Sequence, residues 1–451
     1  MPSDKRVDVL IVGAGAAGLA AARDLSQAGR TVVIVEARPR VGGRVLTVHD
    51  PQSPAPVELG AEFVHGEPLV TLELARAARL TLLELPNIHE IANTGRLTPM
   101  RDLWTMMDQV YHDLGRRLAA RGRDFPVGDY LVSAQLTPQQ HGLLQDFVEG
   151  FYAAQPERLS AKSVAAEATT GGSAAENATQ GNQFRIAEGY DALMNWLRDA
   201  LDPDRVEVRL STIAESIRWK QGGVHVTSRG ADGAELATIA ARTAIVTVPL
   251  ALLKQGAIRF DPALAAKQRA LDGLEMGQIF KIVLRFREAF WDQPGFLEQR
   301  RAPASPVEGL SFLHSPAAEV RVWWTALPVR APLLTGWVGG VAAESLLAAE
   351  PEARLERTLA ALSETIAVPR RELEQQLDTW NTHDWRADPF ARGVYSYIGV
   401  GGMSAPRALA RPVEGTLFFA GEATNGEQIG TVAGALESGR RAAREVLRAL
   451  E

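Results

Sequence analysis

Apolar and polar positions along the chain fall into blocks that predict strands and helices in alternation. The chain opens with an apolar run rich in β-branched residues at 7–12, and a second such run covers 31–35. Between them lies an alanine-rich stretch at 19–27, whose composition favours a helix and which is closed by Gly29. Strand, helix and strand in this order predict a parallel βαβ unit.

The rest of the chain contains further apolar patterns of both kinds, those typical of strands and those typical of helices. Short apolar runs predict strands at 206–208, 213–219, 224–227, 244–248 and 276–286, and the stretch 69–85 predicts a helix followed by a strand. Apolar residues recur at helical spacing over 101–120, 138–152 and 353–366. Within these helices we expect Met106, Met107 and Phe151 to belong to the core rather than to a pocket. The segment 169–181 is rich in small and polar residues and predicts a loop.

Composition places the chain among ordinary globular proteins. The 451 residues, 46% of them hydrophobic and 23% charged, are enough for two domains with large cores. The net charge of −6 argues against a nucleic-acid partner. No apolar run is long enough for a membrane span, and the first residues lack the apolar core of a secretory signal. We therefore expect a cytoplasmic protein.

The absence of cysteine narrows the chemistry. The sequence contains no cysteine, which rules out disulfides, thiolate metal sites, a cysteine nucleophile and a thioether link to a cofactor. The eight histidines are scattered and show no metal-binding spacing, so we predict no metal site.

The glycine loop after the first strand carries the first chemical signal. Gly13 permits a tight turn, Gly15 lets a phosphate approach the backbone, and Gly18 lets the helix pack closely on the sheet. The helix N-terminus attracts phosphate, and Glu36 at the end of the second strand can accept hydrogen bonds from a ribose diol. The pattern predicts a dinucleotide site that disfavours NADP, with NAD and FAD both open. A glycine turn in an unrelated α/β fold is the alternative.

Two arginines and a glycine pair follow Glu36. Arg38 and Arg44 flank Gly42 and Gly43, so positive charge and open backbone lie near the expected phosphates. A solvated basic loop is the other interpretation.

At this point the sequence resembles a known family. The stretch 13–44 is similar to the N-terminus of the flavin-containing amine oxidases, which include monoamine oxidases, polyamine oxidases and flavin-dependent lysine demethylases. The segment Glu-Leu-Gly-Ala-Glu-Phe-Val-His-Gly at 58–66 resembles the family's ELGAxWxHG segment, with Phe63 where tryptophan is common. In the family this backbone follows the flavin's ribityl chain and ring.

The resemblance implies a fold. It predicts an α/β protein with a Rossmann-like FAD-binding domain built from discontinuous segments and an inserted α+β substrate-binding domain. We expect the FAD-binding domain to take residues 1–85, 200–265 and 390–451. The substrate-binding domain would take 86–199 and 266–389.

Later landmarks extend the resemblance to nearly the whole chain. Lys281 lies within an otherwise apolar strand, where the family places a lysine that holds a water beside the flavin N5; a solvent-facing lysine is the alternative. The stretch WRADPFARGVYSY at 385–397 resembles a form found in demethylases and some polyamine oxidases. Val394 replaces the cysteine of covalent flavin attachment, so FAD should be non-covalent.

The resemblance assigns roles to particular residues. Trp385 packs on the flavin, Tyr395 faces the amine, and His65 contacts the substrate unless it is an ordinary loop histidine. Thr431 stands where monoamine oxidases have a second cage tyrosine, and Trp324 belongs either to the pocket or to the core. Ala214, preferred over Ile213, would contact adenine through its backbone. The full set of expected FAD-binding residues is Gly13, Gly15, Ala17, Gly18, Glu36, Ala37, Arg38, Gly43, Arg44, Gly60, Ala61, Glu62, Phe63, Ala214, Trp385, Gly421, Glu422, Thr431 and Val432.

The implied function is oxidation of a polyamine or a monoamine to an imine, with dioxygen reduced to hydrogen peroxide. The motifs lean towards polyamine oxidases, and histone demethylation is not favoured. An L-amino-acid oxidase, a carotenoid- or porphyrinogen-type desaturase and a catalytically silent flavoprotein remain as alternatives. The expected partners are a small amine and dioxygen, in a monomer or homodimer.

Overall fold

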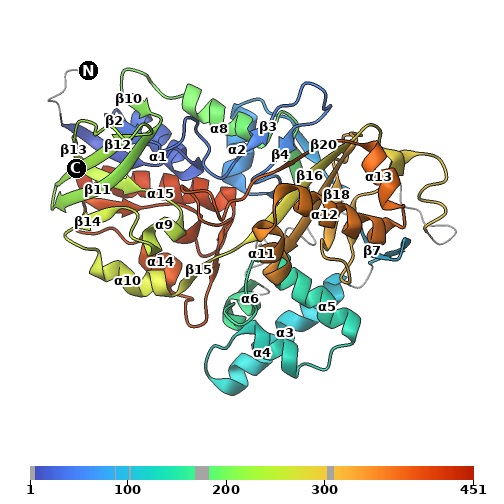
Figure 1. Cartoon of the computed structure of the whole chain (residues 1–451). Helices are drawn as coiled ribbons and strands as arrows, with labels where there is room; N and C mark the ends of the chain where they lie inside the picture. Colours follow the sequence, from blue (N-terminus) through green and yellow to red (C-terminus); the bar gives the residue numbers. More distant parts are fainter. Residues whose placement is uncertain (1–5, 87, 101–102, 168–181, 302–308) are drawn as a thin grey trace.

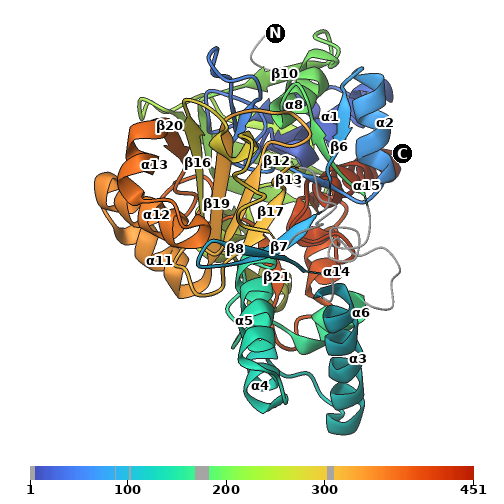
Figure 2. The ribbon, with the colours of Figure 1, turned by 90° about the vertical axis from the view of Figure 1, so that its right-hand side faces the viewer.

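The computed structural model describes residues 6–86, 88–100, 103–167, 182–301 and 309–451. Within these ranges the chain forms two large β-sheets, each covered by helices, and a group of helices that extends away from both sheets (Figures 1 and 2). The loop expected at 169–181 lies outside the described residues.

The first sheet combines strands from three distant stretches of the chain. Its order is β10-β2-β1-β13-β12-β11-β14, and β22 pairs with the end of β13. Strand β1 is parallel to both β2 and β13, which confirms the expected parallel βαβ unit. The strands are β1 Val7–Val12, β2 Val32–Val35, β10 Val206–Arg209, β11 Thr212–Lys220, β12 Gly223–Gly230, β13 Ile239–Val246, β14 Arg259–Asp261 and β22 Leu417–Phe419.

Four helices share a core with the parallel strands of this sheet. They are α1 Ala16–Gln27, α2 Leu69–Ala77, α8 Tyr190–Asp199 and α15 Val432–Leu450. Helix α1 begins directly after Gly15, three residues before the alanine-rich stretch alone suggested. Its fully buried Leu19 and Leu25 belong to the same cluster as Leu193 of α8 and Leu436 of α15. Burial of these side chains holds the glycine loop against the sheet.

The second sheet has the order β20-β16-β19-β18-β17-β7-β8. Strand β16 is central to its packing, since all eight of its residues are buried. Helices α11 Gly340–Ala348, α12 Pro351–Ile366 and α13 Arg370–Gln376 cover the sheet, and α12 confirms the amphipathic helix expected over 353–366. The strands are β7 His89–Asn93, β8 Arg96–Pro99, β16 Ile279–Phe286, β17 Phe312–His314, β18 Val322–Thr325, β19 Leu333–Gly339 and β20 Leu377–Thr382.

A separate helical group follows β8 and lies at the bottom of Figure 2. It contains α3 Leu103–Arg121, α4 Val127–Ser133, α5 Pro138–Asp146, the π-helical turn η1 Phe147–Phe151 and α6 Ala161–Glu167. The helix expected over 138–152 therefore changes to π geometry after Asp146. Met106 and Met107 are buried in the core of this group, as expected.

Short elements connect these layers. They are β3 Thr47–Val48, β4 Val57–Glu58, β5 Val64–His65, β6 Leu82–Glu84, β9 Gln183–Ile186, α9 Leu250–Lys254, α10 Ala265–Asp272, β15 Leu274–Met276, η2 Phe290–Asp292, β21 Ser396–Ile398, α14 Ala405–Ala410 and η3 Glu422–Thr424. Strand β9 pairs with β5 and β6, and α8 packs against α1. We therefore propose the domain division given above with one change, in which residues 182–199 join the FAD-binding domain rather than the substrate-binding segment 86–199.

Candidate active site

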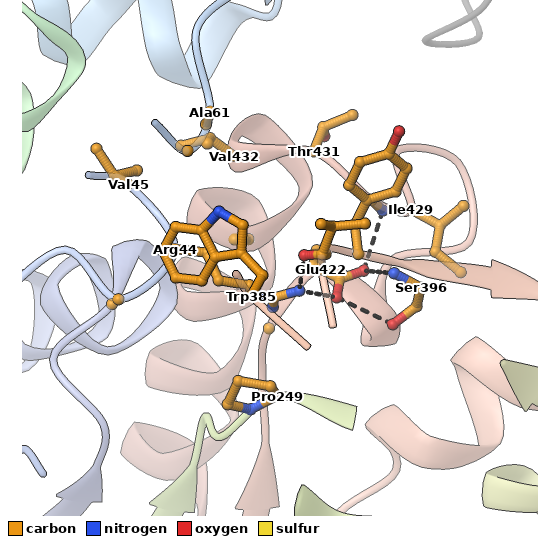
Figure 3. A pocket seen from close by; sticks show the side chains of 18 of the residues that line it. Arg44, Val45, Ala61, Pro249, Trp385, Ser396, Glu422, Ile429, Thr431 and Val432 are labelled. Carbon is orange, nitrogen blue, oxygen red and sulfur yellow. Dashed lines mark hydrogen bonds and ion pairs between the residues drawn. The ribbon is translucent and has the colours of Figure 1, made fainter. Parts of the chain in front are cut away.

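A cavity of about 880 Å³ is lined by residues of both large sheets. It is continuous from the glycine loop after β1 to the aromatic side chains of β17, β18 and β19. Every residue expected from the sequence to bind FAD or substrate lines this cavity, except Gly18. Figure 3 shows part of the wall, with Trp385 and Glu422 from the C-terminal stretch close to Arg44 from the N-terminal one.

The three glycines of the first loop differ in what constrains them. Gly13 has a φ of +108°, and a Cβ there would lie 2.6 Å from Thr247 Oγ1. A Cβ on Gly18 would collide with the carbonyl oxygen of Gly13, so this glycine permits close packing of helix on strand. Gly15 has an ordinary extended backbone, and a Cβ there would meet no protein atom within 4 Å. The protein itself therefore does not require glycine at position 15, but a ligand lying on this backbone would.

Glu36 lies at the end of β2, beside the glycine loop. Its carboxylate accepts hydrogen bonds from the backbone N–H groups of Ala14, at 2.7 Å, and Arg38, at 2.9 Å. Burial raises the pKa of Glu36, while these N–H groups oppose that shift. Each oxygen keeps a further lone pair with which it can accept a ribose hydroxyl. Ala37 lines the cavity next to it.

The two arginines after β2 are paired with distant carboxylates. Two nitrogens of Arg38 donate to the two oxygens of Asp388, at 2.8 and 2.9 Å. Arg44 Nη1 lies 2.9 Å from Glu422 Oε1. Both arginines line the cavity, as do Gly43 and Gly421. The positive charge expected near the phosphates is thus largely balanced by acids more than 300 residues away.

Glu422 connects several parts of the cavity wall. In addition to Arg44, its oxygens accept from Ser396 Oγ at 2.9 Å and from the backbone N–H of Gly430 at 3.0 Å. These contacts, drawn in Figure 3, fix the turn that leads into α15. Thr431 and Val432, at the N-terminus of α15, line the cavity. A helix N-terminus favours negative charge near it.

The segment 59–65 runs along the cavity and presents Gly60, Ala61, Glu62, Phe63 and His65 to it. A Cβ on Gly60 would collide with the carbonyl oxygen of Arg44, so this glycine permits close packing of two backbone segments.

His65 lies farther along the same segment, beside aromatic side chains. Burial lowers its pKa to about 4, so the imidazole is neutral at pH 7. Its Nδ1 is buried without a hydrogen-bond partner among the described residues. His65 makes an edge contact with the ring of Phe151 at 6.2 Å between centroids.

Lys281 belongs to the fully buried strand β16, and its side chain is only 5% exposed. Its Nζ lies 2.6 Å from Glu62 Oε2 and 3.2 Å from the carbonyl oxygen of Gly60. The alternative of a solvent-facing lysine was wrong, because the strand is covered on both faces. Trp324 of β18 donates from Nε1 to Glu62 Oε1 at 2.9 Å, so it is both buried and part of the cavity wall.

Trp385 and Tyr395 are held by backbone carbonyls. Trp385 Nε1 donates to Leu59 O at 2.9 Å, which fixes the indole beside the segment 59–65. The hydroxyl of Tyr395 donates to Phe151 O at 2.8 Å and to Gly150 O at 3.2 Å, and burial raises its pKa. Ala214 also lines the cavity, as does Ile213 beside it.

The expectation that Phe151 belongs to the core was wrong. The π-helical turn η1 adds a residue to the normal helical repeat, and Phe151 lines the cavity with Phe147 stacked on it at 4.9 Å. Helical periodicity could not reveal this change, because the apolar pattern of the segment is the same for either geometry.

Among the polar residues of the cavity wall that were not anticipated from the sequence are His89, His314 and Asp146. His89 Nδ1 lies 2.8 Å from His314 Nε2, and burial lowers the pKa of both imidazoles, that of His314 to about 4. Asp146 is buried at the end of α5, and burial raises its pKa to about 7 against the opposing charge of Arg321. No motif marks these positions, and only the pairing of β7 with β17 and the packing of α5 bring them to the cavity.

The residues present fit FAD. The open space at Gly15, the remaining acceptor capacity of Glu36 and two helix N-termini suit an adenine dinucleotide. The aromatic and lysine-bearing wall suits a ring and a small substrate. In the described part of the chain, no group of three or more His, Asp or Glu side chains is arranged to hold a metal ion. No helix among the residues described is long and apolar enough to cross a membrane.

Comparison with known proteins agrees with this geometry. A family model described as "Flavin containing amine oxidoreductase" matches residues 16–447. Lysine-specific histone demethylase 2 of Homo sapiens is 29% identical over 97% of this chain and 53% of its own length. Polyamine oxidase 2 of Arabidopsis thaliana is 28% identical over 98% of this chain and 89% of its own length. The chain thus spans about half the length of the human demethylase that it matches.

Solved structures share the fold. A putrescine oxidase bound to putrescine superposes with a TM-score of 0.81 at 21% identity, over 98% of this chain and 99% of that one. Cyclohexylamine oxidase from Brevibacterium oxydans IH-35A gives a TM-score of 0.79, also at 21% identity, over 99% of this chain and all of that one. The architecture expected from the sequence, an α/β protein with a Rossmann-like cofactor domain, is therefore confirmed.

Proposed function

The chain belongs to the family of flavin-containing amine oxidoreductases, and on that premise we propose that it oxidises a small amine with non-covalently bound FAD. The observation that carries the proposal is the single continuous cavity. It joins the glycine loop and Glu36, which suit the nucleotide, to Lys281, Trp385 and Tyr395, which suit the reacting end. The absence of cysteine leaves no thiol for a covalent link, and Val394 stands on the cavity wall at the matching position.

When bound, FAD would accept a hydride equivalent from the carbon beside the amine nitrogen and pass both electrons to dioxygen, which gives hydrogen peroxide. The amine becomes an imine, which water hydrolyses to an aldehyde with release of ammonia or of the remaining amine. Lys281 would hold a water by hydrogen bonding. Trp385 and Tyr395 would align the amine, since both side chains are fixed by hydrogen bonds to backbone carbonyls.

Two polar side chains near the reacting end are uncharged, which favours a neutral amine. His65 is uncharged at pH 7, and burial raises the pKa of Tyr395, so its hydroxyl keeps its proton. The substrate therefore needs no strong base from the protein if it binds unprotonated.

Within the amines, Asp146 favours a substrate with a second nitrogen. One of its oxygens is bound to Arg321 at 2.7 Å, and the other is buried without a partner among the described residues. A cationic nitrogen at the far end of a diamine or polyamine would supply that partner and keep the carboxylate charged.

The cavity gives less support to an amino-acid substrate. A carboxylate substrate needs an arginine that can bind it in a bidentate manner. Among the described residues, the arginines on the cavity wall are Arg38, Arg44, Arg229 and Arg392, and the first three are paired with acids.

The test is a substrate screen with the FAD-loaded protein. Peroxide release is measured with putrescine, spermidine, spermine, benzylamine, cyclohexylamine, several L-amino acids and a peptide carrying methylated lysine. We expect turnover of di- or polyamines. Reduction of an artificial electron acceptor in place of dioxygen would identify a dehydrogenase. Turnover confined to amino acids or to the peptide would replace the proposed substrate class, and failure to reduce the flavin with any amine would overturn the function.

A further inference from the structure

Glu62 belongs to the segment 58–66, and its carboxylate is buried in the cavity wall with 6% exposure. Its Oε2 lies 2.6 Å from Lys281 Nζ, and its Oε1 accepts from Trp324 Nε1 at 2.9 Å. Arg185, which lies on β9, also binds Oε1. Three donors thus surround one carboxylate.

The two hydrogen bonds of Lys281 use two of its three N–H groups. An ammonium has three N–H groups, and those of Lys281 reach Glu62 and the carbonyl oxygen of Gly60. Within the described ranges the third donates no hydrogen bond to protein, and Nζ lies 5.7 Å from the centroid of the Trp324 ring. Lys281 lines the cavity. Lys281 and Arg185 carry two positive charges against one negative charge on Glu62, so the cluster has a net positive charge.

We propose that Glu62 is the positioning residue for Lys281: its carboxylate keeps the buried ammonium charged and turns the remaining N–H towards the cavity. The inference rests on the proposed function, because the cavity is taken as the flavin site. Lys281 then acts as a fixed cationic donor and not as a proton acceptor.

The physical reason is the cost of burying an ammonium. Without a carboxylate, burial and a neighbouring guanidinium both favour the neutral amine. Burial alone would raise the pKa of Glu62, but the charges of Lys281 and Arg185 outweigh it and hold that pKa at about 2. The carboxylate therefore stays ionised, and available to Lys281, at every pH at which the fold is normally studied.

The other ionisable groups around Lys281 do not replace Glu62. Glu58 lies four residues earlier, but it is bound to Thr47 and to the N–H of Tyr190, and burial raises its pKa to about 7. The adjacent strand β19 has no ionisable side chain, and Asp378 of β20 is bound to Arg285. Replacement of Glu62 by glutamine should therefore leave Lys281 without a charged partner.

The experiment measures the midpoint potential of bound FAD against a reference dye from about pH 6 to pH 9, which needs no amine substrate. A nearby positive charge raises this potential, since the reduced flavin carries negative charge. In Glu62→Gln, we expect a new pH transition, because Lys281 is charged at low pH and neutral at high pH. At the acid end its potential should lie at or above that of the wild type, because Lys281 and Arg185 are both charged and the carboxylate is gone. At the alkaline end it should fall to that of the double variant Glu62→Gln with Lys281→Met, in which only the Arg185 charge of this cluster remains. Reoxidation by dioxygen should slow about tenfold or more across the same transition.

Control variants separate positioning from structure. Glu58→Gln removes a buried carboxylate that does not touch Lys281, and Arg185→Gln leaves the Glu62–Lys281 pair in place, so neither should show the new transition. If Glu62→Gln does not bind FAD, the double variant Glu62→Gln with Arg185→Gln is measured in its place. This double variant removes the positive charge of Arg185 together with the carboxylate, and it should show the new pH transition.

The inference would be overturned if the midpoint potential of FAD in Glu62→Gln depended on pH as it does in the wild type. Where Glu62→Gln does not bind FAD, the same result in the double variant with Arg185→Gln would overturn it. So would the same new pH transition in a Lys281→Met background, where no lysine is left at this position to titrate. The potential is measured without an amine substrate. If no amine were turned over in the substrate screen, the proposed function would be contradicted, but the pH dependence of the potential would still test the role of Glu62.

Discussion

At the scale of single residues, the glycine loop shows that two glycines of one motif can be needed for different reasons. Gly18 is required by the fold, because a side chain there would enter the backbone of Gly13. Gly15 has space around it and an ordinary backbone, so only a bound ligand explains it. The same motif therefore contains one structural position and one binding position.

Replacement of each glycine by alanine separates these causes. Gly15→Ala should change the stability of the FAD-free protein by less than about 0.5 kcal/mol but weaken FAD binding at least about tenfold. Gly18→Ala should destabilise the FAD-free protein by about 1–3 kcal/mol through overpacking. Denaturant unfolding and FAD titration measure the two effects, and equal stability losses in both variants would contradict the assignment.

At the scale of elements, helix ends and one irregular turn define the cavity. The N-terminus of α15 faces it, and Thr431 caps that helix by accepting from the backbone N–H of Gly434 at 2.9 Å. The turn η1 presents its carbonyls to Tyr395 and Trp337, whose Nε1 donates to Gly150 O at 3.0 Å. Helix ends and π-turns leave backbone groups free, which is why such elements can hold side chains and ligands.

Loss of the cap on α15 should affect both the fold and the cofactor. Thr431→Ala should destabilise the protein by about 1 kcal/mol and speed FAD release, because the first turn of α15 frays towards the cavity. The matched control is Thr137→Ala, which removes the cap of α5 from Gln140 N, far from the nucleotide end of the cavity. It should lower the melting temperature similarly with no change in FAD release. Identical release rates in both variants would argue against a role for the α15 terminus.

At the scale of the whole molecule, the cavity depends on contacts between stretches that are far apart in the sequence. Arg285 of β16 lies 2.5 Å from Asp50, which follows β3, and 2.5 Å from Asp378 of β20. The Glu62–Lys281 pair and the Arg38–Asp388 pair also connect stretches that are hundreds of residues apart. A ligand that fills the cavity should therefore stabilise the molecule as a unit.

FAD should raise the melting temperature of the stripped protein in a concentration-dependent way. Binding to the folded state alone contributes about 2.7 kcal/mol at a ligand concentration a hundred times the dissociation constant. ADP, which fills only the nucleotide end, should give a smaller shift. Acid precipitation of the loaded protein should release all the yellow colour. A shift with NAD but not FAD, or colour retained in the pellet, would contradict the cofactor assignment.

The sequence by itself determined the parallel βαβ unit and the family, and nearly every site residue that it indicated lies on the cavity wall. Gly13 and Glu36 could be placed at the cavity because they stand in a short local motif whose chemistry is readable from residue type and spacing. Lys281 and Trp385 could be placed there because the stretches around them resemble those of the family. Strands such as β1 and helices such as α12 could be placed because their apolar period is local.

Only the tertiary structure decided which charges meet. The partners of Arg38, Arg44 and Lys281 lie on other elements, and no local pattern joins Arg38 to Asp388 or Arg185 to Glu62. The π geometry that turns Phe151 into the cavity is likewise invisible to helical periodicity. Spacing determines which groups a segment offers. The packing of distant segments determines which of these groups become buried and paired, and therefore which charge and which free N–H the cavity finally presents.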